Sequence, residues 1–125
     1  ATMIGSKLPE ALPLLIDKWQ GVGLNERFRY YRYDVGQQFD WHSDGYFKRS
    51  ELERSHYTFM VYLNDDFAGG ATTIENHGIQ PETGMALGFA HHLIHKGQPV
   101  TVGRKYVLRT DVMYRLDEPA GEETP

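Results

Sequence analysis

Short stretches of strand-forming residues, each closed by turn residues, limit the fold of this chain more than any other feature. Asn64-Asp65 and the run Ala68-Gly69-Gly70 are two of these turn signals. Many short strands separated in this way favour an antiparallel sandwich or barrel. We therefore predict a mainly β fold of the jelly-roll type, also called a double-stranded β-helix. The predicted strands are 28–35, 57–63, 71–74, 85–89, 99–102 and 106–114.

One short helix is expected in front of these strands. The apolar residues near helical spacing are Leu8, Leu12, Leu15 and Trp19. Proline interrupts a helix interior, so we predict a helix that begins near Pro9 or Pro13. Gly21 and Gly23 are expected to end it.

Two other segments lack a β pattern. Residues 47–55 are charged and predict a mobile loop of the kind that often closes over a site. Residues 116–125 are acidic and contain Gly and Pro, which predicts a flexible tail.

With 125 residues the chain has room for one hydrophobic core, so residues 1–125 are expected to form a single domain. Without an initiator Met, the sequence also fits a processed chain or a fragment that lacks its natural N-terminal part.

The composition excludes several classes of site. The chain has no cysteine, so any metal has to be held by His and carboxylate side chains. Lys and Arg total 13 against 17 Asp and Glu, a formal net charge of -4, which leaves no broad basic surface for nucleic acid. The longest apolar runs, such as 12–16, are far shorter than the roughly 20 residues that span a bilayer. We expect a cytoplasmic protein without a nucleic-acid or membrane partner.

The tripeptide His42-Ser43-Asp44 is the first sign of chemistry. Side chains separated by one residue point to the same side of an extended backbone, so His42 and Asp44 can chelate one ion. A second imidazole would complete the face of two histidines and one carboxylate that non-haem Fe(II) oxygenases use, with three positions left open. Taken alone, a His and an Asp at this spacing are more often unrelated side chains on a solvated turn.

Other histidines offer a competing metal site. His91 and His95 stand at helical spacing, as in a zinc site, but they follow a predicted strand and have no carboxylate nearby in the sequence. His56 and His77 lie near predicted loops and receive no function. Neither a phosphate-loop Gly-Lys-Ser/Thr nor a hydrolase Gly-x-Ser-x-Gly is present. Metal chemistry is therefore the one sharp signal.

Motifs in a fixed order run through most of the chain. They are Tyr33, Gly36, His42, Asp44, Thr58-Phe-Met-Val-Tyr62-Leu-Asn, Gly69-Gly70-Ala-Thr72, Gly84-Met-Ala-Leu-Gly-Phe89 and the segment from His95-Lys-Gly-Gln-Pro99 to Lys105-Tyr106. This order resembles the catalytic domain of the prolyl 4-hydroxylases, over residues 29–114. The resemblance implies an Fe(II)- and 2-oxoglutarate-dependent dioxygenase in which His42, Asp44 and His95 hold the iron.

The resemblance also implies how the cosubstrate binds. Lys105, ten residues after His95, matches the basic residue that grips the distal carboxylate of 2-oxoglutarate, and Tyr33 matches a tyrosine that donates to it. The implied reaction consumes O2 and couples decarboxylation of 2-oxoglutarate to succinate with hydroxylation of a substrate carbon, with ascorbate as an additional reductant. The expected substrate is a small molecule or a peptide, and a prolyl residue is an analogy from the family.

Residues around Lys105 leave the cosubstrate contacts open. Arg109 shares the strand face of Lys105 because the two are four residues apart, and Asp111 stands where relatives usually have Trp. We favour Lys105 as the anchor, with Arg109 sharing that role, contacting the substrate or pairing with Asp111. Tyr62 and Thr58 match pocket positions of relatives, although alternating side chains of this kind are as often plain core.

Two other interpretations of the same fold stay open. A cupin-like jelly roll would bind a metal for another reaction, such as an isomerisation, and would not turn over 2-oxoglutarate. A non-catalytic ligand-binding or interaction module would have kept the fold and lost the chemistry. The residues that select a substrate lie in loops such as 45–56, whose shape the sequence does not give.

Overall fold

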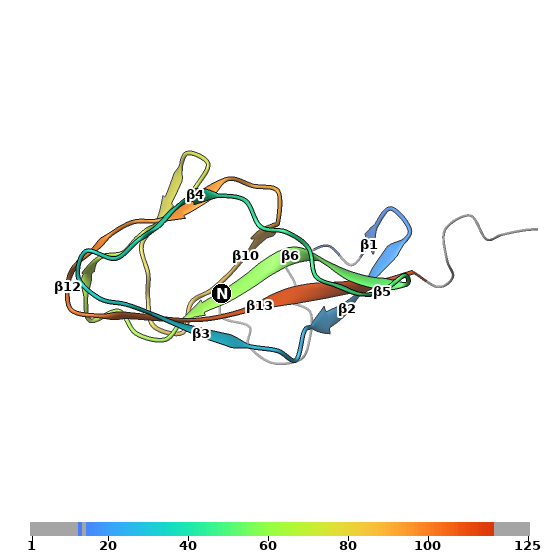
Figure 1. The fold of residues 1–125 in the computed structure, drawn as a ribbon, viewed down its shortest axis with the longest axis horizontal. Coiled ribbons are helices and arrows are strands. Elements are labelled where there is room, and N and C mark those ends of the chain that lie inside the picture. Colours follow the sequence, from blue (N-terminus) through green and yellow to red (C-terminus); the bar gives the residue numbers. More distant parts are fainter. Residues whose placement is uncertain (1–12, 14, 117–125) are drawn as a thin grey trace, which may run out of the picture.

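The structure, a computed structural model, describes residues 13 and 15–116 and is built from strands (Figure 1). Among these residues there is no helix, and so none of the length and apolar character needed to cross a membrane. The strands are β1 (Leu15–Ile16), β2 (Trp19–Leu24), β3 (Arg29–Tyr33), β4 (Phe39–His42), β5 (Lys48–Ser50), β6 (Glu53–Tyr62), β7 (Ala68–Gly69), β8 (Thr72–Ile74), β9 (His77–Ile79), β10 (Ala86–Ala90), β11 (His95–Gly97), β12 (Val100–Val102) and β13 (Lys105–Arg115).

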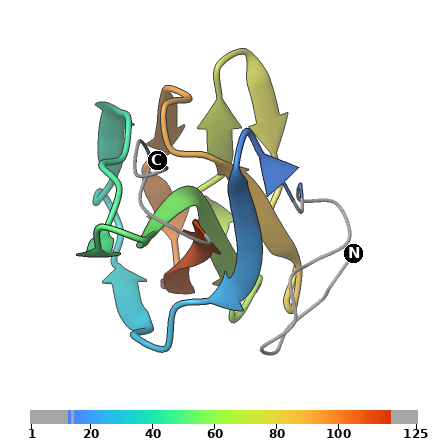
Figure 2. The same ribbon diagram turned by 90° about the vertical axis from the view of Figure 1, so that its right-hand side faces the viewer.

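The strands form two facing layers. A seven-stranded sheet has the order β1-β2-β13-β6-β10, with β3 also paired to β13 and β5 to β6. A four-stranded sheet has the order β4-β11-β8-β9, and β7 pairs separately with β12. Figure 1 shows β4 in the upper layer and β3, β6 and β13 in the lower one, and Figure 2 shows the smaller sheet along the top. Since the described pairings are antiparallel, the predicted mainly β, antiparallel fold is confirmed.

The long central strands β6 and β13 are buried on both faces. One face carries a cluster of buried apolar side chains, Phe59, Val61, Val112 and Tyr114. Side chains alternate along a strand, so Thr58, Met60 and Tyr62 point to the other face, toward the smaller sheet. The larger sheet therefore has one face that packs as core and one that lines the space between the layers.

The predicted strands are all present, and most begin and end within two residues of their expected bounds. The exception is β6, which begins at Glu53, four residues before the predicted start. Seven strands were not predicted as strands. β1 and β2 lie in the predicted helix, β5 in a predicted loop and β7 in a predicted turn, and the others are β4, β9 and β11. β4, β9 and β11 pair with their neighbouring strands over only two or three residues, so the sequence alone carries little strand pattern for these three.

The predicted N-terminal helix is wrong where the structure describes it. Residues 15–24 form the hairpin of β1 and β2 instead, and β2 pairs with β13. Asp17 has a φ of 54°, which the tight turn of a hairpin requires and a helix does not allow. Gly21 and Gly23, expected to end a helix, lie inside β2. Pairing with a long strand outweighed the helical spacing of the leucines, and the rest of the predicted helix lies outside the described residues.

The predicted loop at 47–55 is also wrong. Its residues form β5 and the start of β6, which pair as a hairpin. Arg49 contacts Glu26 at 2.8 Å and Glu53 at 3.1 Å, so the charges of this segment make ion pairs on an exposed hairpin.

The predicted tail, 116–125, is described only at its first residue. Leu116 is buried, and its N–H donates to the carbonyl of Leu52 at 2.8 Å. Residues 117–125 lie outside the described residues, so the prediction of a flexible tail stays a prediction.

Candidate active site

Two histidines from neighbouring strands of the smaller sheet face each other. His42 is the last residue of β4 and His95 the first of β11, and the antiparallel register places them opposite one another, with ring centroids 4.1 Å apart. In each ring Nδ1 lies against a backbone carbonyl, 2.6 Å from that of Asp40 and 2.9 Å from that of Leu93. A carbonyl only accepts, so Nδ1 carries the hydrogen and Nε2 keeps its lone pair for a metal ion.

Asp44 lies against both imidazoles. His42 Nε2 is 3.5 Å from Asp44 Oδ1, and His95 Nε2 is 3.5 Å from Oδ2. One ligand atom from each of the three residues lies within 4.8 Å of the others, which is close enough to hold one ion. The carboxylate also accepts a hydrogen bond from the Thr58 hydroxyl at 2.6 Å. The structure therefore brings together the three side chains that the sequence singled out.

Two phenyl rings fix the imidazoles. Phe39 stacks on His42 with ring centroids 3.8 Å apart and planes at 11°. Phe89 meets His95 edge-on at 4.6 Å. Burial lowers the pKa of His95, which favours the neutral imidazole that a metal ion needs.

The competing arrangement of His91 and His95 is not formed. Residues 91–93 form a turn, and the ring nitrogens of His91 lie 2.7 Å from Ser55 Oγ and 2.9 Å from Thr58 Oγ1. Burial lowers the pKa of His91 to about 4, so this imidazole is neutral at neutral pH. In the described part of the chain, the cluster around Asp44 is the group able to hold an ion.

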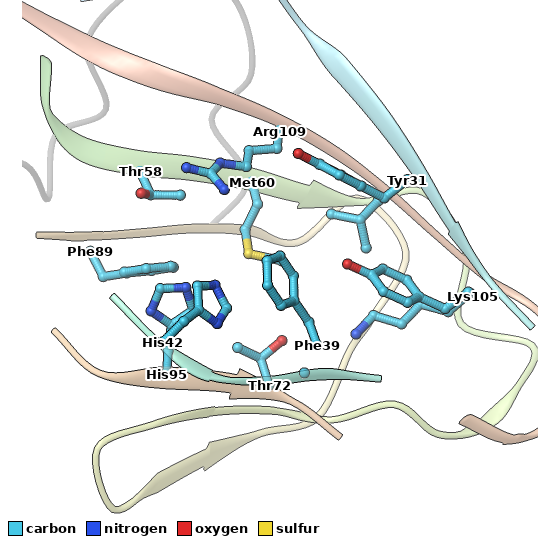
Figure 3. A pocket seen from close by; sticks show the side chains of 13 residues that line it. Tyr31, Phe39, His42, Thr58, Met60, Thr72, Phe89, His95, Lys105 and Arg109 are labelled. Carbon is cyan, nitrogen blue, oxygen red and sulfur yellow. The ribbon is translucent and has the colours of Figure 1, made fainter. Parts of the chain in front are cut away.

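A pocket lies beside this cluster, between the two sheets (Figure 3). In Figure 3 the imidazoles of His42 and His95 lie at one end, the ammonium of Lys105 at the other, and Phe39 and Thr72 between them. The lining residues are Tyr31, Tyr33, Phe39, His42, Thr58, Met60, Thr72, Phe89, His95, Gly97, Lys105, Val107 and Arg109.

Lys105 is a buried cation at the end of the pocket away from the two imidazoles. It is 3% exposed, and its Nζ donates to the carbonyl of Gly70 at 2.8 Å and lies 5.2 Å from the Tyr33 ring centroid. Burial lowers the pKa of Lys105 to about 8. None of the ion pairs among the described residues includes it. An ammonium in this position is stabilised by an anion that enters the pocket.

The backbone of Gly70 is fitted closely around Lys105. Gly70 has a φ of 70°, and a Cβ there would lie 2.8 Å from the Phe67 ring and 3.2 Å from Lys105 Cδ. A larger residue would therefore push on the lysine side chain. The predicted turn at Gly69-Gly70 thus also serves to hold Lys105 in place.

The tyrosines predicted near the cosubstrate differ in their access to the pocket. Tyr33 lies directly opposite Lys105 in the β3–β13 ladder and lines the pocket. Burial raises the pKa of Tyr33, so its hydroxyl keeps its hydrogen. Tyr62 is fully buried and is not a lining residue, but its hydroxyl is hydrogen-bonded to Thr72, which is.

Arg109 lies at the metal end of the pocket and already has acidic partners. Its Nη2 is 3.4 Å from Asp44 Oδ2 and 3.8 Å from Asp111 Oδ1. Lys105 and Arg109 both line the pocket, as their spacing predicts. Burial raises the pKa of Asp111, while the Arg109 charge acts in the opposite direction. Of the two cations, Lys105 is the one without a carboxylate among the described residues.

A family model covers most of the chain. Residues 28–110 match the 2OG-Fe(II) oxygenase superfamily. The chain belongs to this superfamily. The matched range contains the whole cluster of His42, Asp44 and His95, and also Lys105. Among curated proteins, no sequence matches this oxygenase chain.

Two solved structures resemble this oxygenase in fold. The viral collagen prolyl hydroxylase of Paramecium Bursaria Chlorella virus-1, in its 2OG complex, has a TM-score of 0.55 and 23% identity over 73% of this chain and 61% of the viral chain. A Pseudomonas putida prolyl-4-hydroxylase has a TM-score of 0.54 and 18% identity over 71% of this chain and 51% of its own. This oxygenase thus spans about half to three fifths of the length of these structures.

Gly97 and Phe39 line the pocket but were not singled out from the sequence. A Cβ at Gly97 would lie 3.8 Å from Lys105 Nζ and 3.6 Å from Phe39 Cβ, so glycine keeps the space beside the ammonium open. Gly97 follows His95 by two residues, and strand alternation alone could have placed both on one face. Phe39 is an odd number of residues from His42, and an irregularity in the β4–β11 register brings it in.

Proposed function

We propose that this chain is an Fe(II)- and 2-oxoglutarate-dependent dioxygenase in which His42, Asp44 and His95 are the iron ligands. The strongest support is a single pocket with the cluster of His42, Asp44 and His95 at one end and the buried ammonium of Lys105 at the other. Among the described residues, no carboxylate pairs with this ammonium. Two imidazoles that present Nε2, together with one carboxylate, are a donor set that suits Fe(II). Family membership points the same way.

We propose Lys105 as the residue that holds the distal carboxylate of 2-oxoglutarate. Burial destabilises the charged form of Lys105, so a carboxylate of the bound cosubstrate would stabilise this ammonium through a charge-assisted hydrogen bond. Tyr33, opposite Lys105, is proposed to donate to the same carboxylate. Arg109, already held by Asp44 and Asp111, is proposed to orient the metal ligand.

The remaining pocket residues have geometric roles in this proposal. Tyr62 does not line the pocket, but its hydroxyl is hydrogen-bonded to the hydroxyl of Thr72 and so positions that lining residue. Phe39, Met60 and Phe89 give the pocket an apolar lining that keeps water away from the reacting atoms. When bound, Fe(II), 2-oxoglutarate and O2 supply the oxidising chemistry, in which decarboxylation to succinate is coupled to hydroxylation of a substrate carbon.

The proposed fold in finer terms is a jelly roll within a single domain. Two facing antiparallel sheets with a ligand pocket between them support it. The proposed substrate is a small molecule or a peptide. A prolyl substrate is suggested by the two structural neighbours, which are prolyl hydroxylases, and ascorbate is proposed as an accessory reductant.

Anaerobic addition of Fe(II) and then 2-oxoglutarate tests the proposal directly. A weak visible charge-transfer band develops when the keto acid chelates ferrous iron, and we expect it in the wild type. Asp44→Ala removes one ligand and should abolish the band. Glu51→Ala is the matched control, because it removes an exposed carboxylate that pairs with Lys48 far from the pocket.

The outcomes separate the proposed function from its alternatives. A band in the wild type and in Glu51→Ala, but not in Asp44→Ala, supports the dioxygenase. Bound iron without a band would overturn it in favour of a cupin-like metal protein. Absence of iron binding at micromolar protein would overturn it in favour of a non-catalytic module.

A further inference from the structure

A chain of buried hydrogen bonds runs from Asp44 to the backbone of Phe47. Thr58 Oγ1 lies 2.6 Å from Asp44 Oδ2 and 2.9 Å from His91 Nδ1. Ser55 Oγ lies 2.7 Å from His91 Nε2 and accepts from the N–H of Phe47 at 2.8 Å. The three linking residues are 0% (Ser55), 1% (Thr58) and 6% (His91) exposed. Water therefore competes little for these bonds.

The Asp44 carboxylate and the neutral form of His91 fix the direction of every bond in this chain. As an ion the carboxylate only accepts, so the Thr58 hydroxyl donates its hydrogen to Asp44 and accepts from Nδ1–H of His91. Burial keeps His91 neutral by lowering its pKa, so its Nε2 carries no hydrogen and accepts from the Ser55 hydroxyl. The Ser55 oxygen in turn accepts from the N–H of Phe47. Each hydroxyl accepts one bond and donates one.

Backbone bonds hold both ends of the chain. The N–H of Asp44 donates to the carbonyl of His91 at 2.9 Å, and the N–H of His91 donates to the carbonyl of His56 at 3.0 Å. The N–H of Ser55 donates to the carbonyl of Phe47 at 2.9 Å, so Ser55 grips Phe47 through two bonds. The connection between β4 and β5 is thus tied to β6 at both of its ends.

We propose that Thr58, His91 and Ser55 are positioning residues that form a one-way hydrogen-bond relay and hold the Asp44 carboxylate in the orientation a metal ion requires. The inference rests on the proposed metal site. Without the Thr58 hydroxyl, Asp44 Oδ2 keeps only the longer contacts with Arg109 at 3.4 Å and His95 at 3.5 Å, so the carboxylate is held less firmly. Residues that orient a metal ligand in this way commonly change metal affinity by about 10- to 100-fold.

A purely structural cluster would behave differently from a positioning relay. Loss of a buried hydroxyl that only supports the fold lowers the unfolding temperature and leaves the metal affinity of the folded protein unchanged. Loss of a positioning hydroxyl raises the metal dissociation constant of protein that is still folded. The relay also predicts dependence along the chain, because the side-chain hydrogen bonds that link Ser55 to Asp44 pass through His91 and Thr58.

Mn(II) and Co(II) binding to the purified protein, measured by calorimetry without cosubstrate, tests the relay. Thr58→Val keeps the shape and removes the hydroxyl, and we expect its dissociation constant to rise about 10- to 100-fold. Thr58→Ser restores the hydroxyl and should stay within about threefold of the wild type. Thr110→Val is the matched control: it deletes a buried hydroxyl of β13 that donates to the backbone carbonyls of Asn25 and Arg27 and makes no hydrogen bond to the cluster.

Ser55→Ala provides a second, milder variant in case Thr58→Val does not fold. It should raise the dissociation constant less than Thr58→Val, and it should add no further loss in a Thr58→Val background. The Co(II) absorption spectrum gives an independent readout of ligand geometry, and it should change in Thr58→Val but not in Thr58→Ser or Thr110→Val.

Failure of the relay and failure of the metal site look different in this experiment. If wild-type protein binds neither Mn(II) nor Co(II), the proposed function fails and the relay with it. If the wild type binds metal and Thr58→Val binds it as tightly as Thr110→Val does, the relay alone is overturned. A full effect of Ser55→Ala in the Thr58→Val background would also overturn it, since Ser55 would then act by another route.

Discussion

Replacement of Lys105 by methionine should weaken cosubstrate binding and stabilise the metal-free fold at the same time. Lys105 is buried, and its ammonium has a backbone carbonyl but no carboxylate as a partner. Burial lowers its pKa from 10.5 to about 8. Methionine has a similar length and no charge, so Lys105→Met removes the ammonium with little change in packing.

The pKa shift gives the size and the sign of the stability effect. Below pH 8 the lysine is charged in both the folded and the unfolded state, and the folded state carries the whole burial penalty, about 3 kcal/mol. As the pH rises through 8 the folded protein loses its proton first, so the penalty shrinks. Relative to Lys105→Met, the wild type should gain about 2 kcal/mol of unfolding free energy between pH 7 and pH 9.5.

Loss of the ammonium should also weaken 2-oxoglutarate binding. A charge-assisted hydrogen bond contributes about 1.5–3 kcal/mol, which corresponds to a roughly 10- to 150-fold higher dissociation constant. Urea unfolding of metal-free protein at pH 7 and 9.5 measures the first effect, and calorimetric titration of the Mn(II)-loaded protein with 2-oxoglutarate measures the second. Lys96→Met is the control, because Lys96 lies on β11 over the Trp41 ring and does not line the pocket.

Two results would refute this reasoning. An unfolding free-energy difference between wild type and Lys105→Met that stays constant from pH 7 to 9.5 would show that burial does not penalise the ammonium. An unchanged 2-oxoglutarate dissociation constant in Lys105→Met, together with a raised one in Arg109→Met, would show that Arg109 and not Lys105 binds the distal carboxylate.

Three further changes probe other parts of the molecule. His95→Ala removes an imidazole whose Nε2 lies beside Asp44, so it should abolish metal retention after dialysis, as measured by elemental analysis. His77→Ala, on the exposed β9, is the control and should retain metal like the wild type. Gly97→Ala places a Cβ 3.8 Å from Lys105 Nζ and should raise the 2-oxoglutarate dissociation constant about fivefold or more, while metal affinity stays unchanged in the same calorimetric assay. Phe59→Ala, on the face of β6 opposite the pocket, should lower the unfolding free energy by about 3–5 kcal/mol in urea, and a loss below 1 kcal/mol would contradict the core described for the larger sheet.

Local pattern was enough to predict most of the larger sheet. Alternation in β6 correctly separated Thr58 and Met60 from Phe59 and Val61, and alternation in β13 correctly put Lys105 and Arg109 on one strand face. Those strands are long, and one of their faces is apolar core, so the sequence carries a repeated signal.

Features that depend on distant pairing could not be predicted from local pattern. His42 and His95 meet because β4 and β11 are neighbours, and these strands are too short to show a pattern of their own. Helical spacing of apolar residues that reaches Leu15 and Trp19 suggested a helix, but residues 15–24 form a hairpin paired with β13. The charges at 47–55 suggested a loop, but β5 pairs there with the start of β6. The family motifs supplied the pairing of the two histidines that the local pattern lacked.

Lys105 and Arg109 lie on the same strand, β13, which limits how far the distance between their backbone positions can change. β13 pairs with β3 from Lys105 to Arg109 and with β6 from Val107 onward. A strand held by two ladders cannot shift by part of a residue, so the backbone positions that carry the ammonium and the guanidinium are fixed. The opposite wall includes β4 and β11, which pair over two residues with a register irregularity between them. Substitutions at positions of that wall that hold no metal, such as Phe39, can therefore reshape the pocket while the two cations keep their places on β13.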